Sequence, residues 1–365
     1  MKAVIAIDSF KGCLSSAEAA AAVAEGLAGC DCAALPVSDG GEGFAAVLTS
    51  ALGGQTVYAS VHDPLGRLVT ASYGLIEETA VIESAAASGL TLMSPDELDP
   101  LRASSRGTGE LIADAIRRGA RDIYVGFGGT GTNDGGSGMI EALEEVRDMW
   151  QECRFTGLCD VSATFCGPEG ATAVYGPQKG VKPGQVAVLD ARLRALAGQY
   201  RPVLGRDVLT QPGSGAAGGM AGALWAVLGA ELRPGADAIL DILHFEDHLA
   251  DASLVITGEG RIDSQTLQGK LPAVVARRAK AFPNSSPDTF SPAPSNLTRS
   301  TKAFSPTLRV VALTGCNALT VPQTLFDDII QITPDGTPLS VALDPAFARH
   351  HLTTSARLLS SFDRR

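Results

Sequence analysis

Several short segments of this 365-residue chain combine glycines with charged side chains, a pattern that suits phosphate and metal chemistry. The segment 8–12 (DSFKG) follows a β-branched apolar run, and its Lys11 could bind a phosphate or a carboxylate. The segment 38–43 (SDGGEG) offers a backbone that can approach a ligand closely and two carboxylates that can hold Mg²⁺ or a hydroxyl. Glycine and aspartate also make ordinary turns, so each segment alone is a weak signal.

Two longer glycine loops have a similar composition. Residues 126–131 (GFGGTG) match the G-x-G-x-x-G pattern of dinucleotide-binding dehydrogenases, but no strand with an acidic end follows about 20 residues later. The continuation 132–139 (TNDGGSGM) makes Asp134 a candidate base or metal ligand. In residues 257–263 (TGEGRID), Arg261 could hold a phosphate and Asp263 could hold Mg²⁺, although the two could also form a structural ion pair. The dehydrogenase alternative is therefore the weaker one.

Alternating strands and helices must hold these loops. Ser15 and Glu18 form a capping-box pattern before an alanine-rich helix, and residues 61–73 alternate around a turn, which predicts an antiparallel hairpin at the entry to a second domain. Apolar runs predict strands at 2–7, 32–37, 79–83, 122–127, 253–257, 309–313 and 328–332, and helical periodicity predicts helices at 108–118, 185–197 and 264–280. The repeated strand–loop–helix order predicts an α/β fold with a parallel sheet.

Composition excludes several function classes. A net charge of −11 and the lack of a basic stripe argue against a nucleic-acid partner. The seven cysteines include no C-x-x-C pair, which favours reduced thiols in a cytoplasmic protein over a zinc ribbon or a disulfide framework. No run reaches the roughly 18 apolar residues of a membrane span, so no membrane partner is expected. Residues 282–307, dominated by Ser, Pro, Thr and Asn, are expected to form a disordered insert.

Six segments taken in order resemble the type 1 glycerate kinase family. They are residues 8–12 (DSFKG), 39–43 (DGGEG), 105–112 (SRGTGELI), 128–139 (GGTGTNDGGSGM), 176–180 (GPQKG) and 257–263 (TGEGRID). The resemblance covers residues 1 to 280 and implies a Rossmann-like parallel-sheet domain built from both chain ends, residues 1–60 plus 251–365. A second α/β domain, residues 61–250, would be inserted between them. It also implies transfer of a phosphoryl group from ATP, with Mg²⁺, to D-glycerate, giving 2-phosphoglycerate or 3-phosphoglycerate.

Candidate residues are assigned by role. The catalytic candidates are Lys11, Asp39, Asp134 and Asp263, and nothing in the spacing ranks the three carboxylates as the base. The candidates for substrate binding are Asp8, Ser9, Arg106 and Thr108, of which Arg106 and Thr108 are directed at the glycerate carboxylate. The candidates for ATP binding are Gly40, Gly41, Gly43, Gly128, Gly129, Asn133, Gly258, Gly260 and Arg261, and the candidate metal ligands are Glu42 and Glu259.

The chain departs from the family pattern at three places. The stretch after Met139 is short, residues 162–165 (SATF) stand where the family tends to have Asn-Pro-Leu, and residues 282–307 are inserted. The first two departures leave open an alternative in which the chain has lost turnover and only binds a ligand or a partner. A homodimer is also left open.

Overall fold

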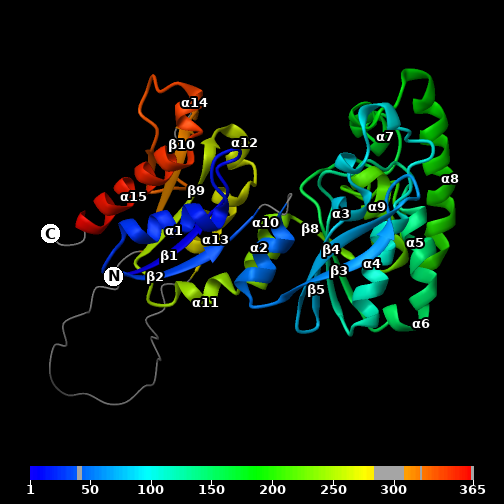
Figure 1. The fold of residues 1–365 in the computed structure, drawn as a ribbon, viewed down its shortest axis with the longest axis horizontal. Coiled ribbons are helices and arrows are strands. Elements are labelled where there is room, and N and C mark those ends of the chain that lie inside the picture. Colours follow the sequence, from blue (N-terminus) through cyan, green and yellow to red (C-terminus); the bar gives the residue numbers. More distant parts are fainter. Residues whose placement is uncertain (39–42, 283–307, 321–322, 363–365) are drawn as a thin grey trace, which may run out of the picture. The chain divides into compact units, whose positions relative to one another are not determined.

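The computed structural model describes residues 1–38, 43–282, 308–320 and 323–362. The chain forms two compact units, one of Met1–Val37 with Leu240–Arg365 and one of Ser38–Ile239, both drawn in Figure 1. The first unit is therefore built from both chain ends and the second is inserted between them, as the family resemblance implies. The limits at residues 61 and 250 stay a prediction for the domain boundaries, and strand β3 (Gln55–His62), which precedes residue 61, pairs within the second unit. The expected insert, from residue 283 onward, lies outside the described residues.

The first unit contains a five-stranded sheet in the order β11-β10-β9-β1-β2, with every neighbouring pair parallel. Its strands are β1 (Lys2–Ile7), β2 (Asp31–Pro36), β9 (Leu254–Ile262), β10 (Arg309–Asn317) and β11 (Asp328–Gln331). Alternate residues of β1, among them Ile5 and Ile7, pack against helices α1 (Ser16–Gly26) and α15 (Pro345–Phe362). Because all five strands run the same way, their carboxyl ends meet at one edge of the sheet.

The second unit contains a six-stranded mixed sheet in the order β3-β4-β5-β6-β7-β8. Strands β3, β4 (Leu68–Ile76) and β5 (Thr79–Glu83) pair antiparallel, which confirms the expected hairpin, and β5 to β8 pair parallel. The remaining strands are β6 (Asp122–Gly126), β7 (Arg154–Leu158) and β8 (Glu231–Arg233). The parallel half has its own carboxyl edge, at which the glycine loop after β6 begins.

Helices complete both units. The other helices of the first unit are α11 (Phe245–Leu249), α12 (Ser264–Leu267), α13 (Leu271–Ala281) and α14 (Leu339–Ala342). Those of the second unit are α2 (Phe44–Ala51), α3 (Ala85–Ser88), α4 (Arg106–Arg117), α5 (Ser137–Leu143), α6 (Arg147–Trp150), α7 (Ala171–Tyr175), α8 (Val186–Leu204) and α9 (Met220–Val227), and α10 (Gly235–Ile242) spans the limit between the units.

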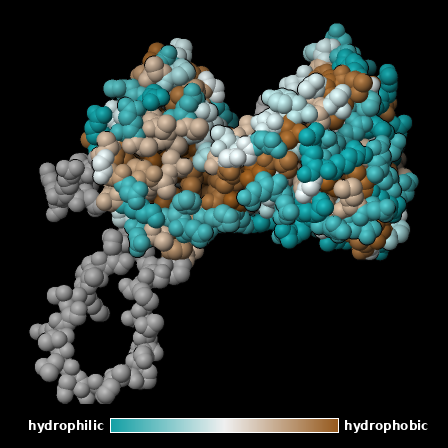
Figure 2. Space-filling model, turned by 60° about the horizontal axis from the view of Figure 1, so that its bottom comes forward, coloured by the Kyte–Doolittle hydropathy of each residue, from teal (hydrophilic) through white to brown (hydrophobic). Residues whose placement is uncertain are grey.

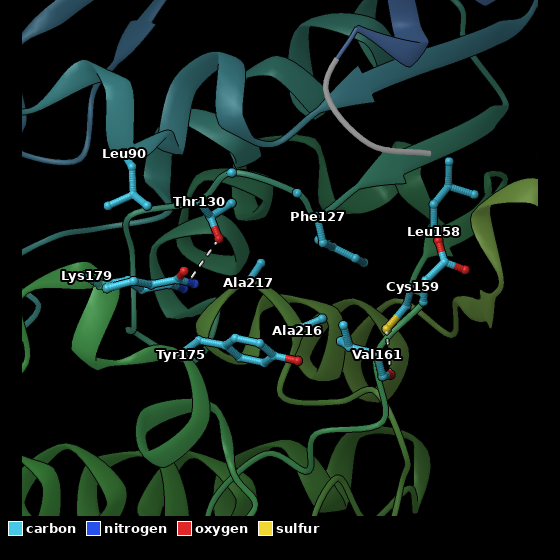
Figure 3. Close-up of a pocket in the computed structure, with 14 residues that line it drawn as sticks. Leu90, Phe127, Thr130, Leu158, Cys159, Val161, Tyr175, Lys179, Ala216 and Ala217 are labelled. Atoms are coloured by element: carbon cyan, nitrogen blue, oxygen red, sulfur yellow. Dashed lines mark hydrogen bonds between the residues drawn. The ribbon is translucent and has the colours of Figure 1, made fainter. Parts of the chain in front are cut away.

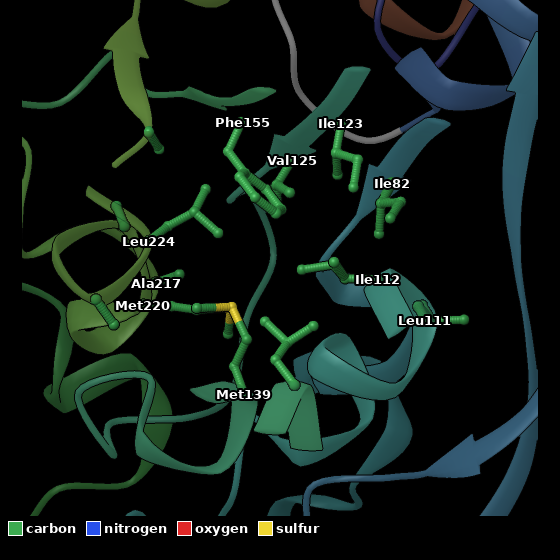
Figure 4. Packing of buried hydrophobic residues seen from close by; sticks show 14 of the residues in the cluster. Ile82, Leu111, Ile112, Ile123, Val125, Met139, Phe155, Ala217, Met220 and Leu224 are labelled. Atoms are coloured by element: carbon green, nitrogen blue, oxygen red, sulfur yellow. The ribbon is translucent and has the colours of Figure 1, made fainter. Parts of the chain in front are cut away.

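The core of the second unit lies between the sheet and helices α4, α5 and α9 (Figure 4). Strand residues that alternate along β6, such as Ile123 and Val125, meet Ile112 of α4 and Met220 of α9. All four side chains are almost fully buried. Their burial is worth roughly 1.5–3 kcal/mol each and anchors the loops that leave the strand ends.

Two predicted elements differ in extent from the structure. Strand β9 continues beyond the expected residue 257 because Arg261 pairs with Cys316 of β10, so that polar residues of the TGEGRID segment lie on a strand. The single helix expected at 264–280 is split into α12 and α13 at Gly269, whose φ of +134° is incompatible with a helix. The predicted capping box at Ser15 and Glu18 is confirmed at the start of α1.

Hydrophilic residues predominate on the face of the second unit that Figure 2 presents at the right. None of the helices that the structure describes has the length and apolar character that a membrane span needs.

Candidate active site

A cavity of about 540 Å³ opens at the carboxyl edge of the parallel sheet in the first unit. It lies where β1, β9, β10 and β11 end, which is where open parallel sheets bind ligands. Among the residues predicted for the site, those that line this cavity are Asp8, Ser9, Lys11, Glu259, Gly260, Arg261 and Asp263. Two chain-distant motifs thus contribute to one cavity, because β1 and β9 are hydrogen-bonded neighbours.

Both charged and apolar residues line the cavity. Lys11, Arg261 and Lys270 provide three cationic groups, of which the sequence analysis singled out the first two. Leu339 and Leu343, from the segment that follows β11, are among its apolar residues. A cavity that combines apolar surface with a few cations suits a nucleotide, whose base is flat and apolar and whose phosphates are anionic.

The Glu259 carboxylate is held at the wall of this cavity. Thr266 Oγ1 donates a hydrogen bond of 2.6 Å to Glu259 Oε1, and the Lys270 Nζ atom lies 3.7 Å from Glu259 Oε2. Burial raises the pKa of the Glu259 carboxyl, although the Thr266 hydrogen bond and the Lys270 and Lys11 charges act in the opposite direction. Glu259 therefore has the environment of a group that can exchange a proton or take up a cation.

Asp8 and Asp263 have structural bonds as well as access to the cavity. Asp8 is almost fully buried, and its Oδ1 atom accepts a hydrogen bond of 2.7 Å from the Ser9 backbone N–H. Asp263 caps helix α12 by accepting a hydrogen bond of 2.9 Å from the Gln265 backbone N–H. Its Oδ2 atom also lies 3.7 Å from Arg261 Nε, so the two residues form the ion pair that the sequence left open as an alternative. Both carboxylates therefore have fixed positions at the cavity.

Gly258 serves the packing of the strands. A Cβ atom at this position would lie 1.9 Å from the Leu313 carbonyl oxygen, so no side chain fits between β9 and β10 here. Its carbonyl oxygen accepts a hydrogen bond of 2.9 Å from the Asp8 backbone N–H. Gly258 is therefore needed to bring Asp8 and the β9 carboxyl end together, and it is not among the residues that line the cavity.

A second cavity, of about 330 Å³, lies in the second unit beyond the ends of β6 and β7 (Figure 3). The predicted residues Gly128 and Gly129 line it, together with Thr130, Tyr175 and Lys179. The sequence analysis did not assign a role to Lys179, although it lies in the GPQKG segment. Figure 3 shows the Lys179 side chain extended toward Thr130.

Lys179 is an almost fully buried cation. Its side chain reaches across the glycine loop, where Nζ donates a hydrogen bond of 2.8 Å to the Thr132 carbonyl oxygen and lies 3.4 Å from Thr130 Oγ1. Burial lowers the pKa of the Lys179 ammonium to about 8, and the Asp134 charge acts in the opposite direction. The signals in the sequence that could have marked it were its place between two glycines and the resemblance of residues 176–180 to the family pattern.

Asp134 lies in a dense network of hydrogen bonds. Its Oδ2 atom accepts bonds of 2.8 Å from both the backbone N–H and the hydroxyl of Ser105, and a bond of 3.2 Å from the Gly138 N–H. Its Oδ1 atom accepts a bond of 3.1 Å from the Gly136 N–H. This carboxylate joins the loop before α5 to the start of α4. Asp134 lines a third cavity, of about 430 Å³, and not the one that contains Lys179.

Asn133 precedes this network and is buried. Its amide Nδ2 donates a hydrogen bond of 2.8 Å to Thr172 Oγ1. Within the part of the chain that the structure describes, Asn133 Oδ1 and Thr132 Oγ1 have no hydrogen-bond partner. Buried polar atoms of this kind are rare, and they cluster at functional sites.

Two predicted substrate-binding residues point elsewhere. Thr108 is fully buried, and its hydroxyl bonds to Ser88 Oγ at 2.7 Å and the Ser84 carbonyl oxygen at 3.2 Å. Arg106 forms an ion pair of 2.9 Å with Glu110 on the same helix. Neither residue lines any of the three cavities described here. Their assignment to the glycerate carboxylate stays a prediction, without support from this geometry.

The glycine–carboxylate segment of residues 38–43 is only partly described. Asp39, Gly40, Gly41 and Glu42 lie outside the described residues. The Gly43 backbone N–H, at the start of α2, donates a hydrogen bond of 3.1 Å to the Glu83 carboxylate.

The carboxylates of the first cavity fit a magnesium ion that is bound together with phosphates. In the described ranges, no three His, Cys, Asp or Glu side chains form a ready metal cluster. Mg²⁺ characteristically takes only one or two protein carboxylates and completes its shell with water and phosphate oxygens. Asp8, Glu259 and Asp263 therefore suffice as candidate ligands on the protein side.

Known proteins resemble this chain over most of its length. The model of the glycerate kinase family matches residues 3–146 and 142–285. The glycerate 2-kinase of Escherichia coli (strain K12) is 41% identical over 315 residues, 77% of this chain and 83% of that protein. The glycerate kinase of Bacillus subtilis (strain 168) is 42% identical over 77% of this chain and 82% of that protein. A crystal structure assigned provisionally as glycerate kinase 2 from Salmonella typhimurium LT2 matches with a TM-score of 0.83 and 36% identity, covering 100% of this chain and 98% of that one.

Proposed function

The chain belongs to the glycerate kinase family, and we propose that it transfers the γ-phosphoryl group of ATP to a hydroxyl of D-glycerate in the presence of Mg²⁺. The observation that carries the proposal is the gathering of the predicted residues from two distant motifs around the cavity at the carboxyl edge of β1 and β9. The product expected from the E. coli relative's name is 2-phosphoglycerate, with 3-phosphoglycerate as the alternative.

The first cavity is the proposed site of the ATP phosphates. Phosphoryl transfer needs the protein to position the reactants and to neutralise charge that develops on the transferred group. Lys11, Arg261 and Lys270 supply positive charge to this cavity, and Leu339 and Leu343 offer an apolar surface for the base. Asp8 and Asp263 would hold Mg²⁺, which would supply further positive charge for the phosphates.

The carboxylates of the cavity could serve two roles, as metal ligands and as the proton acceptor. Asp8 and Asp263 each have one oxygen held by a backbone N–H group, which fixes the carboxylate at the cavity as a candidate metal ligand. Glu259 has a raised carboxyl pKa because of burial, which brings it nearer to the range in which a general base works. We therefore favour Glu259 as the proton acceptor of this cavity, and Asp39 and Asp134 stay alternatives from the sequence.

Reduced thiols support a cytoplasmic setting, where ATP is also available. All seven cysteines lie in the described part of the chain, and all are free. A homodimer stays a prediction.

A coupled assay tests the function. Purified full-length protein is incubated with ATP, Mg²⁺ and D-glycerate, ADP release is followed, and the product is assigned by phosphorus NMR. We expect ADP release only when both glycerate and Mg²⁺ are present, and a single phosphoglycerate isomer. Folded protein that releases no ADP with D-glycerate would refute the proposal.

A further inference from the structure

The cavity of the second unit contains a buried positive charge, on which the Asp134 carboxylate acts without forming an ion pair. Lys179 is 2% exposed, and in the described ranges no carboxylate forms an ion pair with it. Its contacts are a carbonyl oxygen and a hydroxyl, from Thr132 and Thr130. A buried ammonium normally has a carboxylate partner, because desolvation makes an unpaired charge costly. The chain keeps Lys179 there despite this cost, which points to an anion supplied from outside.

The other polar groups of the cavity are those that a small hydroxy acid needs. The Tyr175 hydroxyl and the Gln178 amide line it and can bond to ligand hydroxyls. Burial raises the pKa of Tyr175, so its hydroxyl keeps its proton and stays a donor. Asp160 also lines the cavity and offers an acceptor for a ligand hydroxyl. Leu90 and Phe127 provide apolar wall around them.

We propose that this cavity binds the carboxylate of the acceptor hydroxy acid, with the Lys179 ammonium as the residue that selects an acid over an uncharged polyol. The proposal rests on the proposed function and deepens it. It makes the second unit responsible for the acid, and it gives Lys179 a role that the sequence analysis had directed to Arg106 and Thr108.

The balance of charge favours the acid over the nucleotide phosphates as the occupant. A triphosphate carries several negative charges, and the three cations of the first cavity match it better than one lysine does. Glycerate carries a single carboxylate, which one ammonium neutralises. A second carboxylate, Asp160, lines the Lys179 cavity and would repel a polyanion more strongly than a monoanion.

The test uses a buried and an exposed lysine of the same segment. Lys179→Met removes the charge and keeps the length of the side chain, and Lys182→Met makes the same change at an exposed position. D-Glycerate is titrated into each full-length protein without nucleotide, followed by calorimetry, and a non-hydrolysable ATP analogue with Mg²⁺ is titrated separately. Intrinsic fluorescence of Trp150 and Trp225, the two tryptophans of the chain, checks that the second unit is folded.

We expect Lys179→Met to raise the Kd and the KM for D-glycerate by roughly 30-fold or more, as loss of one partner of a buried charged contact does. The KM for ATP and the affinity for the analogue should stay unchanged, and Lys182→Met should behave as wild type. The affinity of the wild type for D-glycerate should also fall above about pH 8, where Lys179 loses its proton. The nearby groups Tyr175 and Cys159 have pKa values above their ordinary ones, so they do not account for this change.

The outcomes separate this inference from the proposed function. If the wild type phosphorylates D-glycerate and Lys179→Met keeps the same KM and Kd, the inference fails and the function stands. A fall in affinity for the ATP analogue in place of D-glycerate would overturn the inference in favour of a phosphate site. If the wild type shows no turnover, the proposed function fails, but the D-glycerate titration still tests the inference. D-Glycerate that binds to the wild type and not to Lys179→Met supports the inference. D-Glycerate that does not bind to the wild type refutes it.

Discussion

Replacing Lys179 by methionine should stabilise the second unit at neutral pH and destabilise it at high pH. Lys179 is buried, and its charge has only a carbonyl and a hydroxyl as close partners. Methionine has a similar length and no charge, so it removes the desolvation cost of the ammonium while filling the same space. The two effects of the substitution, loss of the charge and loss of the hydrogen bonds, have different pH dependences.

The magnitude follows from the pKa of this group. A change from the ordinary value of 10.5 to about 8 corresponds to roughly 3 kcal/mol of folding free energy, at 1.4 kcal/mol for each tenfold change. Because the folded-state pKa is lowered, the unfolded chain binds more protons between pH 8 and 10.5, and wild-type stability rises with pH there. The lost hydrogen bonds cost the variant about 1–2 kcal/mol at every pH. We therefore expect the variant to be about 1–2 kcal/mol more stable at pH 7 and less stable above pH 10.

Urea unfolding at a series of pH values measures this difference. Both tryptophans, Trp150 and Trp225, belong to the second unit, so their fluorescence reports on its unfolding separately from the first unit. The quantity compared is the free energy of unfolding of the wild type minus that of Lys179→Met at each pH. Titrating groups that both proteins share contribute equally to the two free energies, so their contributions cancel in this difference. Lys182→Met, at an exposed position, provides the matched control, and its stability difference from the wild type should not change sign with pH.

A difference that is constant from pH 7 to 10.5 would refute the reasoning, because it would mean that Lys179 has the same pKa in the folded and unfolded states. A variant that is less stable at pH 7 would show that the hydrogen bonds to Thr132 and Thr130 outweigh the desolvation of the charge.

Three further predictions concern the candidate site. Lys11→Ala should lower kcat by roughly 100-fold with an unchanged Tm, as loss of one preorganised charge typically does, and Lys11→Arg should rescue only in part; near-wild-type kcat/KM would return Lys11 to an ordinary surface role. Asp134→Ala should lower the free energy of unfolding by about 3 kcal/mol or more, because it leaves the Ser105, Gly136 and Gly138 N–H groups unpaired; urea curves indistinguishable from wild type would contradict this. Chelation with EDTA should abolish turnover, and added Mg²⁺ should restore it; activity that persists in EDTA would exclude a metal-dependent transfer.

Much of the first unit could be predicted from the sequence because its signals are local. The β-branched run of residues 2–7 and the Ser15–Glu18 capping box specify a strand, a loop and a helix without help from other segments. Since parallel strands align their carboxyl ends, Lys11 after β1 and Arg261 in β9 had to approach the same edge. Knowing that the sheet is parallel was therefore enough to predict that the two distant motifs lie at the same edge.

The surroundings of the candidate residues in the second unit depend on long-range packing, which no local sequence pattern predicts. Thr108 and Arg106 lie in a glycine-containing segment, and the structure buries Thr108 against Ser84 and Ser88. Asp134 lies in a loop with the composition of a catalytic loop, and its carboxylate accepts hydrogen bonds from Ser105, which is 29 residues away in the chain.

Lys179 illustrates the reason most clearly. Its place in the sequence marks it as a lysine between glycines, which is usually an exposed residue. Its ammonium meets Thr132, 47 residues earlier, only because the loop after β6 and the segment after α7 come together over the same strand ends. The sequence by itself determined which residue types were present and which strands would align them. Burial, and with it the cost and the chemistry of a charge, was decided by tertiary structure, because desolvation depends on every chain-distant atom that displaces water around a group.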